Sequence, residues 1–251
     1  IGVDARPLVS ESPSGIGIYL LEILKRLDDN GNTYILYSNE PIKNRDPALE
    51  RFEKRIVRGK IGTLVICLKM GKALKEDRID EFWGTEHMLP LFTKGIRRVL
   101  TVHDLALLIN PKWGSKKNVI MQNIFCRLSC KCADHVIADS IATKKDICRL
   151  LHIIDKKVTV IYMGGAQSTP LPFSVKEEQT IRKQLGVNDS SFFAYVGNIE
   201  PRKNIENIVK AFEIAKSDLD NECKLVLAGK LGWRTDSIIK SIDNSKYKSS
   251  I

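Results

Sequence analysis

The sequence predicts an α/β protein with two doubly wound, Rossmann-like domains, the second of them incomplete. Short apolar runs alternate with helical patterns along most of the chain. A segment rich in glycine and proline, residues 164–172, interrupts this alternation, which then resumes and stops at residue 251. With 251 residues, the chain is long enough for two modest domains.

The first domain is expected to cover residues 1–165 and to begin with a short buried strand at residues 1–3. A loop containing Gly15 and Gly17 should follow, and then a helix from Tyr19, because apolar residues recur from there at helical spacing. Strands that alternate with helices predict a mostly parallel sheet. The further strands of this domain are predicted at residues 33–37, 80–83, 98–102, 135–138 and 158–161.

Residues 166–190 are predicted to form a linker and a connecting helix, because the glycines and prolines of this region oppose regular structure. Residues 191–251 then repeat the strand and helix pattern. A complete domain of this type needs roughly 150 residues, so the second domain is expected to be partial. Its elements are predicted to be a strand at 192–196, a loop at 197–204, a helix at 205–216 and a strand at 224–228.

The composition excludes several classes of protein. Hydrophobic residues make up 43% and charged residues 28% of the chain, as in folded globular proteins and unlike disordered or fibrous ones. No apolar run approaches the roughly 20 residues of a membrane-spanning helix, and the first residues do not resemble a signal peptide, so a cytoplasmic protein is expected. The spacings of Cys126, Cys130 and Cys132 fit no common metal site, so we expect buried thiols and no metal.

Basic residues outnumber acidic ones and give a net charge of +10. Seven of them lie between Lys54 and Lys75 with no acidic residue among them, and apolar residues recur at helical spacing between Ile61 and Leu68. A basic amphipathic helix of this kind can lie on an anionic membrane, which predicts peripheral attachment at the inner face of the cell membrane through residues 54–75. A helix that faces the core and solvates its basic side is the alternative.

Gly15 and Gly17 lie between a predicted strand and a predicted helix. Glycines at such a position let backbone amides approach a phosphate, and the start of the helix adds partial positive charge. The dinucleotide-binding fingerprint would have a third glycine where this chain has Leu20, so an NAD site is not expected. An ordinary loop with flexible glycines is the alternative.

His103 and Asp104 directly follow the strand predicted at 98–102. They should therefore lie at the carboxyl edge of the sheet, where open α/β sheets bind their ligands. A histidine there can donate a hydrogen bond to a substrate hydroxyl or phosphate, and Asp104 can cap the next segment. A pair that only caps a loop is the alternative.

Arg202 and Lys203 occupy a turn between the strand at 192–196 and the helix at 205–216. Arg202 can form a fork with phosphate oxygens, and Lys203 adds a compact positive charge. A solvated turn in which Asn204 caps the following helix is the alternative.

In this order, the segments resemble the retaining glycosyltransferases of group 1 (family 4), which have the two-domain GT-B fold. The resemblance covers nearly the whole chain. It is carried by GVDARP (2–7) with GIGIY (15–19), TVHDL (101–105), ADHVIADS (133–140), YVGNIEPRKN (195–204) and LAGKLGW (227–233).

The resemblance implies transfer of a hexose from a nucleotide sugar with retention at the anomeric carbon. In the family, the residues matching Arg202 and Lys203 neutralise the departing diphosphate, and the residue matching His103 reaches the donor sugar. The remaining residues expected to bind substrate are Gly15, Gly17, Asp104, Asn198 and Glu200. The segment at 195–204 is similar to that of mannosyltransferases of surface-polysaccharide assembly, which implies GDP-mannose as the donor and a saccharide or lipid-linked acceptor. Neither a cofactor nor a nucleic acid is expected.

Three departures from the family pattern leave other functions open. Many members carry arginine where this chain has Ile18 and Asn198, and the family's paired glutamates, eight positions apart, have no match. A catalytically inactive GT-B-like fragment that acts in interaction is therefore one alternative. A basic nucleic-acid-binding protein is another, although it would explain the net charge and not the motifs.

Overall fold

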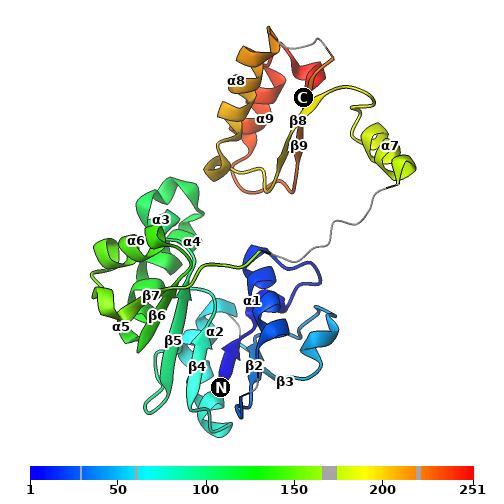
Figure 1. Cartoon of the computed structure of the whole chain (residues 1–251). Helices are drawn as coiled ribbons and strands as arrows, with labels where there is room; N and C mark the ends of the chain where they lie inside the picture. Colours follow the sequence, from blue (N-terminus) through cyan, green and yellow to red (C-terminus); the bar gives the residue numbers. More distant parts are fainter. Residues whose placement is uncertain (29, 60–61, 166–173, 219–221) are drawn as a thin grey trace. The chain divides into compact units, whose positions relative to one another are not determined.

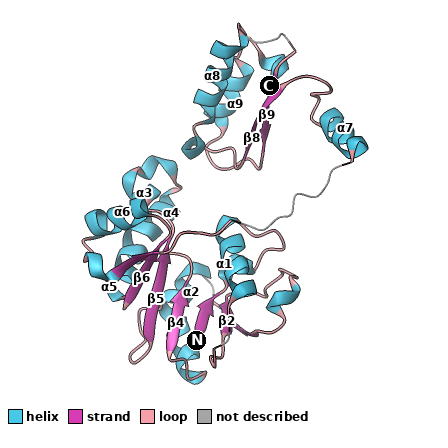
Figure 2. Cartoon of the chain, in the orientation of Figure 1, coloured by secondary structure: helices cyan, strands magenta, loops and turns pink. Residues whose placement is uncertain are grey.

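Seven short segments of the first unit form one parallel sheet in the order β3-β2-β1-β4-β5-β6-β7. The structure is a computed structural model that describes residues 1–28, 30–59, 62–165, 174–218 and 222–251, with only the backbone of residues 62–68. Figures 1 and 2 trace the elements. The strands are β1 (Gly2–Asp4), β2 (Ile35–Ser38), β3 (Glu53–Ile56), β4 (Glu81–Gly84), β5 (Arg97–Val102), β6 (His135–Ala138) and β7 (Val158–Val160).

Helices cover both faces of this sheet, because alternate residues of its strands point to opposite sides. On β2, Tyr37 joins a core with α2, whereas its neighbour Leu36 joins a core with α1. The predicted doubly wound architecture is thus confirmed for this unit. Its helices are α1 (Gly15–Arg26), α2 (Gly62–Glu76), α3 (Ala106–Ile109), α4 (Lys116–Met121), α5 (Arg127–Cys132) and α6 (Ile141–Leu151), with a π-helical turn at Gln122–Cys126 between α4 and α5.

The second unit contains two parallel strands, β8 (Phe192–Val196) and β9 (Lys224–Ala228), joined through α8 (Ile205–Lys216). These three elements have the bounds predicted from the sequence. The helix α7 (Val175–Gln184) precedes them and begins with a capping box between Ser174 and Glu177, and α9 (Asp236–Asp243) follows them. Contacts divide the chain into Ile1–Lys112 with Lys116–Ala166, and Trp113–Ser115 with Gln167–Ile251.

Short 3₁₀ turns connect several of these elements. They lie at Arg6–Leu8, Pro47–Leu49, Pro111–Trp113, Asp155–Lys157, Pro201–Lys203 and Lys248–Ser250. The linker predicted at 166–190 falls partly outside the described residues, which resume at residue 174. Within the described residues, no helix is both long and apolar enough to cross a bilayer.

The strand β3 was not predicted, because its four residues are exposed and three of them are charged. It lies at the edge of the sheet and pairs only with β2, so it needs no apolar face.

The basic run at 54–75 begins on this strand and continues along α2. The fold brings acidic groups to it, since Arg55 lies 3.1 Å from Glu76 and 3.6 Å from Asp77, and Lys72 lies 3.8 Å from Glu76. The side chains predicted to form an apolar stripe between Ile61 and Leu68 lie outside the described residues.

Candidate functional site

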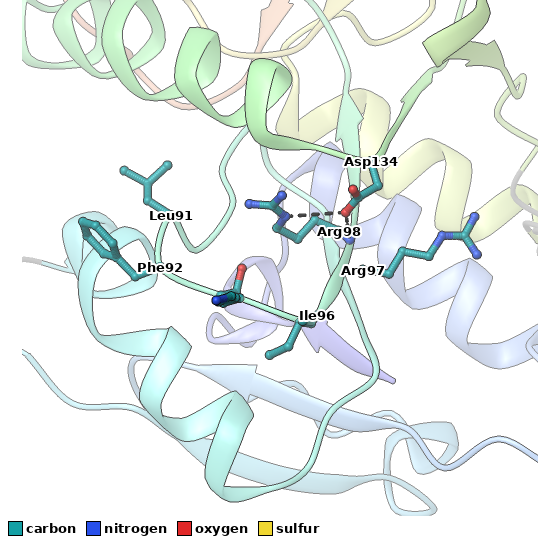
Figure 3. A pocket seen from close by; sticks show the side chains of 9 residues that line it. Leu91, Phe92, Ile96, Arg97, Arg98 and Asp134 are labelled. Atoms are coloured by element: carbon teal, nitrogen blue, oxygen red, sulfur yellow. Dashed lines mark hydrogen bonds and ion pairs between the residues drawn. The ribbon is translucent and has the colours of Figure 1, made fainter.

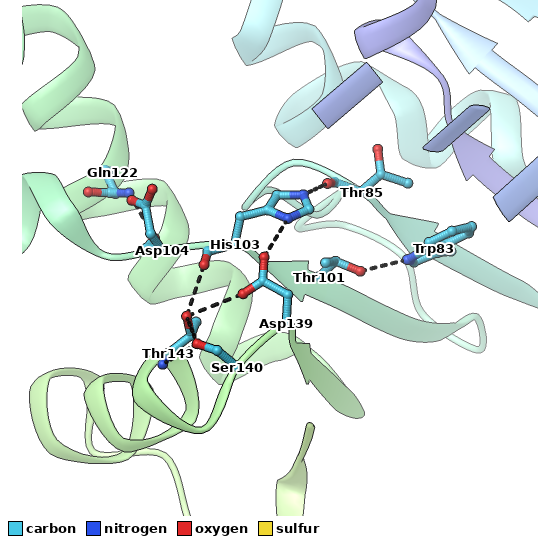
Figure 4. Close-up of polar contacts among 9 residues, drawn as sticks. All are labelled: Trp83, Thr85, Thr101, His103, Asp104, Gln122, Asp139, Ser140 and Thr143. Atoms are coloured by element: carbon cyan, nitrogen blue, oxygen red, sulfur yellow. Dashed lines mark hydrogen bonds and ion pairs between the residues drawn. The ribbon is translucent and has the colours of Figure 1, made fainter. Parts of the chain in front are cut away.

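The carboxyl ends of β4, β5 and β6 hold a connected group of polar residues around His103 (Figure 4). The His103 ring donates from Nε2 to the Thr85 carbonyl oxygen at 3.0 Å, and its Nδ1 lies 3.1 Å from Asp139 Oδ2. His103 is therefore at the predicted edge of the sheet. Both of its ring nitrogens contact oxygens of this unit, so a sugar that hydrogen-bonds the ring must first displace one of these partners.

The backbone around His103 is held by the first turn of α6. Thr143 donates from its hydroxyl to the His103 carbonyl oxygen at 2.9 Å, and the Ser140 hydroxyl caps α6 by accepting from the Thr143 amide at 3.0 Å. The segment 133–140, quoted above for the resemblance, thus supplies the ring partner of His103, which is Asp139, and the Ser140 cap of the helix turn from which Thr143 holds the His103 backbone.

Asp104 supports the start of α3 through its side chain, although Leu105, which makes no side-chain cap hydrogen bond, occupies the N-cap position. Its carboxylate accepts from the Ala106 amide at 3.0 Å, at the start of α3, and its carbonyl oxygen accepts from Gln122 Nε2 at 3.2 Å. The side chain remains exposed. In this arrangement Asp104 orders the loop after β5, and a substrate contact by Asp104 stays a prediction.

Gly15 and Gly17 lie in the first turn of α1, so the expectation that both belong to the loop before the helix was wrong. The helix begins at Gly15, four residues earlier than predicted, with Ser14 in the N-cap position and without a side-chain cap hydrogen bond. A Cβ atom on Gly17 would lie 2.6 Å from the Pro7 carbonyl oxygen, whereas one on Gly15 would meet nothing within 4 Å. The lack of a side chain at Gly17 therefore allows α1 to pack closely against Pro7, whereas Gly15 borders open space.

That open space continues into a groove of about 390 Å³ between α1 and the segment after β7. The residues that line it include Gly15, Tyr19 and Arg26 on α1 and Tyr162 after β7. The Tyr19 ring also meets the His103 ring edge-on, with centroids 5.0 Å apart. Two of the predicted substrate-binding segments are thus adjacent in space.

Sequence reasoning assigned no role to Asp4 and Arg6, although both belong to the first quoted segment. Arg6 donates from Nε to Asp4 Oδ1 at 2.9 Å and from Nη2 to Asp4 Oδ2 at 2.8 Å, and both side chains are buried. Arg6 Nη2 also lies 3.7 Å from Glu86 Oε2. Burial raises the pKa of Glu86, and the charge of Arg6 opposes this rise. The network joins the ends of β1 and β4.

His87 is a second residue that the sequence did not single out. Its φ of 56° is in the left-handed region, which is strained for a histidine, and its ring centroid lies 5.7 Å from that of His103. Its Nδ1 is buried without a hydrogen-bond partner among the described residues. Burial, aided by the nearby His103, lowers the pKa of His87 to about 4. No spacing or motif in the sequence identifies this position.

The low pKa of His87 predicts that acid destabilises the first unit. The unfolded pKa is about 6.5, so between that value and about 4 the unfolded state binds a proton that the folded state excludes. The contribution of the neutral His87 ring to the free energy of unfolding is therefore fully present above pH 6.5 and is lost as the pH decreases toward 4. Between about pH 7.5 and about pH 5 we expect a loss of about 2 kcal/mol that His87→Asn does not show. Urea unfolding at both pH values measures it, and equal pH dependence of the two proteins would refute the assignment.

The second unit brings the two remaining motif segments together at the carboxyl ends of β8 and β9. The Ile199 amide donates to the Lys230 carbonyl oxygen at 2.9 Å, and the Gly232 amide donates to the Ile199 carbonyl oxygen at 2.9 Å. Gly197, with a φ of 152°, lies directly against Gly229, where a Cβ atom would overlap the Gly197 carbonyl oxygen. The approach of the two loops therefore requires glycine.

Arg202 and Lys203 project from the short turn Pro201–Lys203 beside these loops. Arg202 Nε lies 3.2 Å from Glu200 Oε1, which orients the guanidinium, and Lys203 is exposed. Asn204 precedes α8 in the left-handed region but makes no side-chain cap hydrogen bond, unlike the capping alternative drawn from the sequence. Asn198 is exposed, and its carbonyl oxygen accepts from the Tyr195 hydroxyl at 2.9 Å.

A further hollow of about 900 Å³ lies at the start of β5 (Figure 3). His103 follows the other end of this strand. At the hollow, the Arg98 amide donates to Asp134 Oδ2 at 2.7 Å, and Arg98 Nε lies 3.5 Å from the same atom. None of the predicted site residues lines this hollow. Its position at the amino ends of the strands separates it from the candidate site.

Residues 13–164 match the family model described as Glycosyltransferase Family 4. The chain belongs to this family. Residues 177–250 of this family 4 glycosyltransferase match a second family model, described as Glycosyl transferases group 1. The recognition of the group from its sequence segments is thereby confirmed.

Among curated proteins, O-antigen chain mannosyltransferase B of Escherichia coli is 22% identical over 147 residues, which are 59% of this chain and 38% of that protein. Among solved structures, Anabaena Alr3699/HepE in complex with UDP-glucose has a TM-score of 0.66 at 18% identity and covers 98% of this chain. A glycosyltransferase from Rickettsia africae ESF-5 has a TM-score of 0.64 at 15% identity and covers the whole chain.

These structural likenesses confirm the α/β, GT-B type of fold for the family 4 glycosyltransferase described here. The chain spans 38% of the length of the curated relative and 65% and 66% of the lengths of the two solved structures.

Proposed function

We propose that this chain takes part in the transfer of a hexose from a nucleotide sugar to a saccharide or lipid-linked acceptor, with retention of configuration. The best candidate for the donor is GDP-mannose. The observation that carries the proposal is the hydrogen-bonded pairing of the two loops after β8 and β9, where Gly197 and Gly229 are in close contact. The first of these loops carries Arg202 and Lys203. Membership of family 4 and the distant likeness to a mannosyltransferase support the proposal.

The chemistry explains why cations are needed there. When the bond between sugar and diphosphate breaks, negative charge grows on the departing diphosphate, and fixed cations stabilise it most in the transition state. Arg202 is held by Glu200 and offers a planar fork, whereas Lys203 is exposed and offers a point charge. We assign diphosphate binding to both, and contacts with sugar or acceptor to His103 and to the open space beside Gly15, whereas the buried Gly17 allows the close packing of α1 that borders this space.

We also place the acceptor at an anionic membrane face, near the basic residues 54–75. Arg58 and Lys69 line a hollow of about 490 Å³ there and have no ion-pair partner among the described residues. Arg55 and Lys72 line the same hollow but share Glu76. The surface is therefore less positive than the run of sequence indicates.

Calorimetric titration with GDP-mannose, UDP-glucose, GDP and UDP tests the proposal. We expect binding of one nucleotide type, and at least about tenfold weaker binding by Lys203→Ala, since a charged hydrogen bond contributes about 1.5–3 kcal/mol. Lys210→Ala, which removes an exposed lysine from α8 of the same unit, is the matched control and should bind normally. Absence of binding to all four compounds by the folded protein would instead favour an inactive GT-B-like protein that acts in interaction.

A further inference from the structure

The helical segment from α4 through the π turn to α5 has two opposite faces of different character. Its inward face carries Gln122, Cys126 and Cys130, which are buried. Its outward face carries Ile120, Ile124 and Leu128, whose exposed fractions are 55%, 49% and 40%. Because the two stripes are offset by two residues, or roughly 200° around the helix, the apolar outward stripe makes no contribution to the core that the inward stripe already forms.

The π turn keeps the outward stripe in line. In a regular α-helix, residues four apart drift by about 40° around the axis. The π turn at Gln122–Cys126 places more residues in each turn, so Ile120, Ile124 and Leu128 follow one another with less drift. We call these three residues the α4–α5 ridge.

The charged side chains along the segment that carries the ridge have one sign. From Leu105 to Ala133 the sequence contains five basic residues and no acidic one. Lys116 and Lys117 lie one turn before Ile120, and Lys131 lies one turn after Leu128. Where the structure describes these three lysines, none is ion-paired with a carboxylate. The five basic residues are Lys112, Lys116, Lys117, Arg127 and Lys131.

We propose that the α4–α5 ridge docks on an anionic lipid surface. Three aliphatic side chains flanked by lysines at both ends match the interface between acyl chains and headgroups, where the apolar groups are buried and the lysine stems extend to phosphates. A nucleic acid would match the cations and leave the aliphatic stripe exposed. The membrane-facing surface therefore lies on α4 and α5 and not only on the basic run at 54–75.

This inference rests on the proposed function, in which the acceptor lies at an anionic membrane face, and it names a surface that would contact that membrane. Its test uses neither donor nor acceptor, so vesicle binding can fail while nucleotide binding succeeds, and the reverse.

Co-sedimentation with vesicles tests the proposal, using phosphatidylglycerol mixed with phosphatidylcholine and, separately, phosphatidylcholine alone. We expect the protein to bind the mixed vesicles and to be released by salt. Ile120→Ser/Ile124→Ser should weaken this binding by at least about tenfold. The matched control, Ile154→Ser/Ile214→Ser, removes two isoleucines that are 58% and 76% exposed elsewhere and should bind normally.

A second variant tests the proposal independently, in case the ridge variant does not fold. Lys116→Gln/Lys117→Gln keeps the ridge and should weaken binding more than Lys54→Gln/Lys69→Gln, which removes two exposed lysines of the basic run. The proposal is overturned if the protein binds neither kind of vesicle, or if the folded Ile120→Ser/Ile124→Ser variant binds the mixed vesicles as tightly as the unmodified protein does. A ridge that instead mediates self-association would appear as a dimer in sedimentation, lost in the ridge variant, without vesicle binding.

Discussion

Arg6→Met is expected to destabilise the first unit by about 3–5 kcal/mol, because it leaves a buried carboxylate without its partner. Asp4 is completely buried, and Arg6 meets both of its carboxylate oxygens. Removal of the guanidinium leaves that charge without its ion-pair partner at the end of β1, a strand in the interior of the sheet. Chemical unfolding followed by circular dichroism measures the loss of stability.

The double variant Asp4→Leu/Arg6→Met provides the control for this prediction. It removes both charges, so it should be clearly more stable than Arg6→Met alone, since apolar replacement of a buried ion pair is often tolerated. If the single and double variants lost equal stability, packing of the Arg6 side chain rather than its charge would be the cause.

The second large effect is expected from Gly229→Ala. A Cβ atom at this position would overlap the Gly197 carbonyl oxygen, and the atoms nearest to it all belong to the backbone of Gly197 and Asn198, which cannot rotate aside as a side chain could. We expect the loops after β8 and β9 to separate, at a cost of about 1–3 kcal/mol or more. Because these loops position Arg202 and Lys203, nucleotide binding should weaken as well.

Hydrogen exchange of the amides in β8 and β9 measures this change locally. The control is Gly15→Ala, since a Cβ atom there meets nothing within 4 Å and alanine favours a helix. Unchanged protection in Gly229→Ala would mean that the two loops can separate without affecting the strands, and would contradict the expectation.

The sequence predicted the strands that carry a run of apolar residues, whether the fold buries that run, as in β1, or leaves it largely exposed, as in β8. The strands β6, β8 and β9 have the predicted bounds, and β2, β4, β5 and β7 differ from them by at most two residues at either end. Parallel strands between two helical layers leave continuous apolar runs, which are readily recognised. The edge strand β3 has no such run, because water covers its side chains.

The candidate site was predicted less completely, and the reason is spatial. His103 and Asp139 are far apart in sequence, and only the parallel register that pairs Val102 with Ala138 brings them together. Glu86 and His87 belong to no recognisable motif, so their place beside His103 follows from the fold alone. A count of charges along residues 54–75 likewise could not include Glu76 and Asp77.

The sheet order also governs when the protein can fold during synthesis. The first strand of the chain, β1, lies between β2 and β4, and Gly2 pairs with Ile35 on one side and Phe82 on the other. A ribosome adds about 5–20 residues per second. Several seconds therefore pass between the synthesis of β1 and the synthesis of β4, its second neighbour in the sheet. Until β4 has been made, the edge of β1 that will face it is open and can pair with other chains, because β2 covers only the opposite edge.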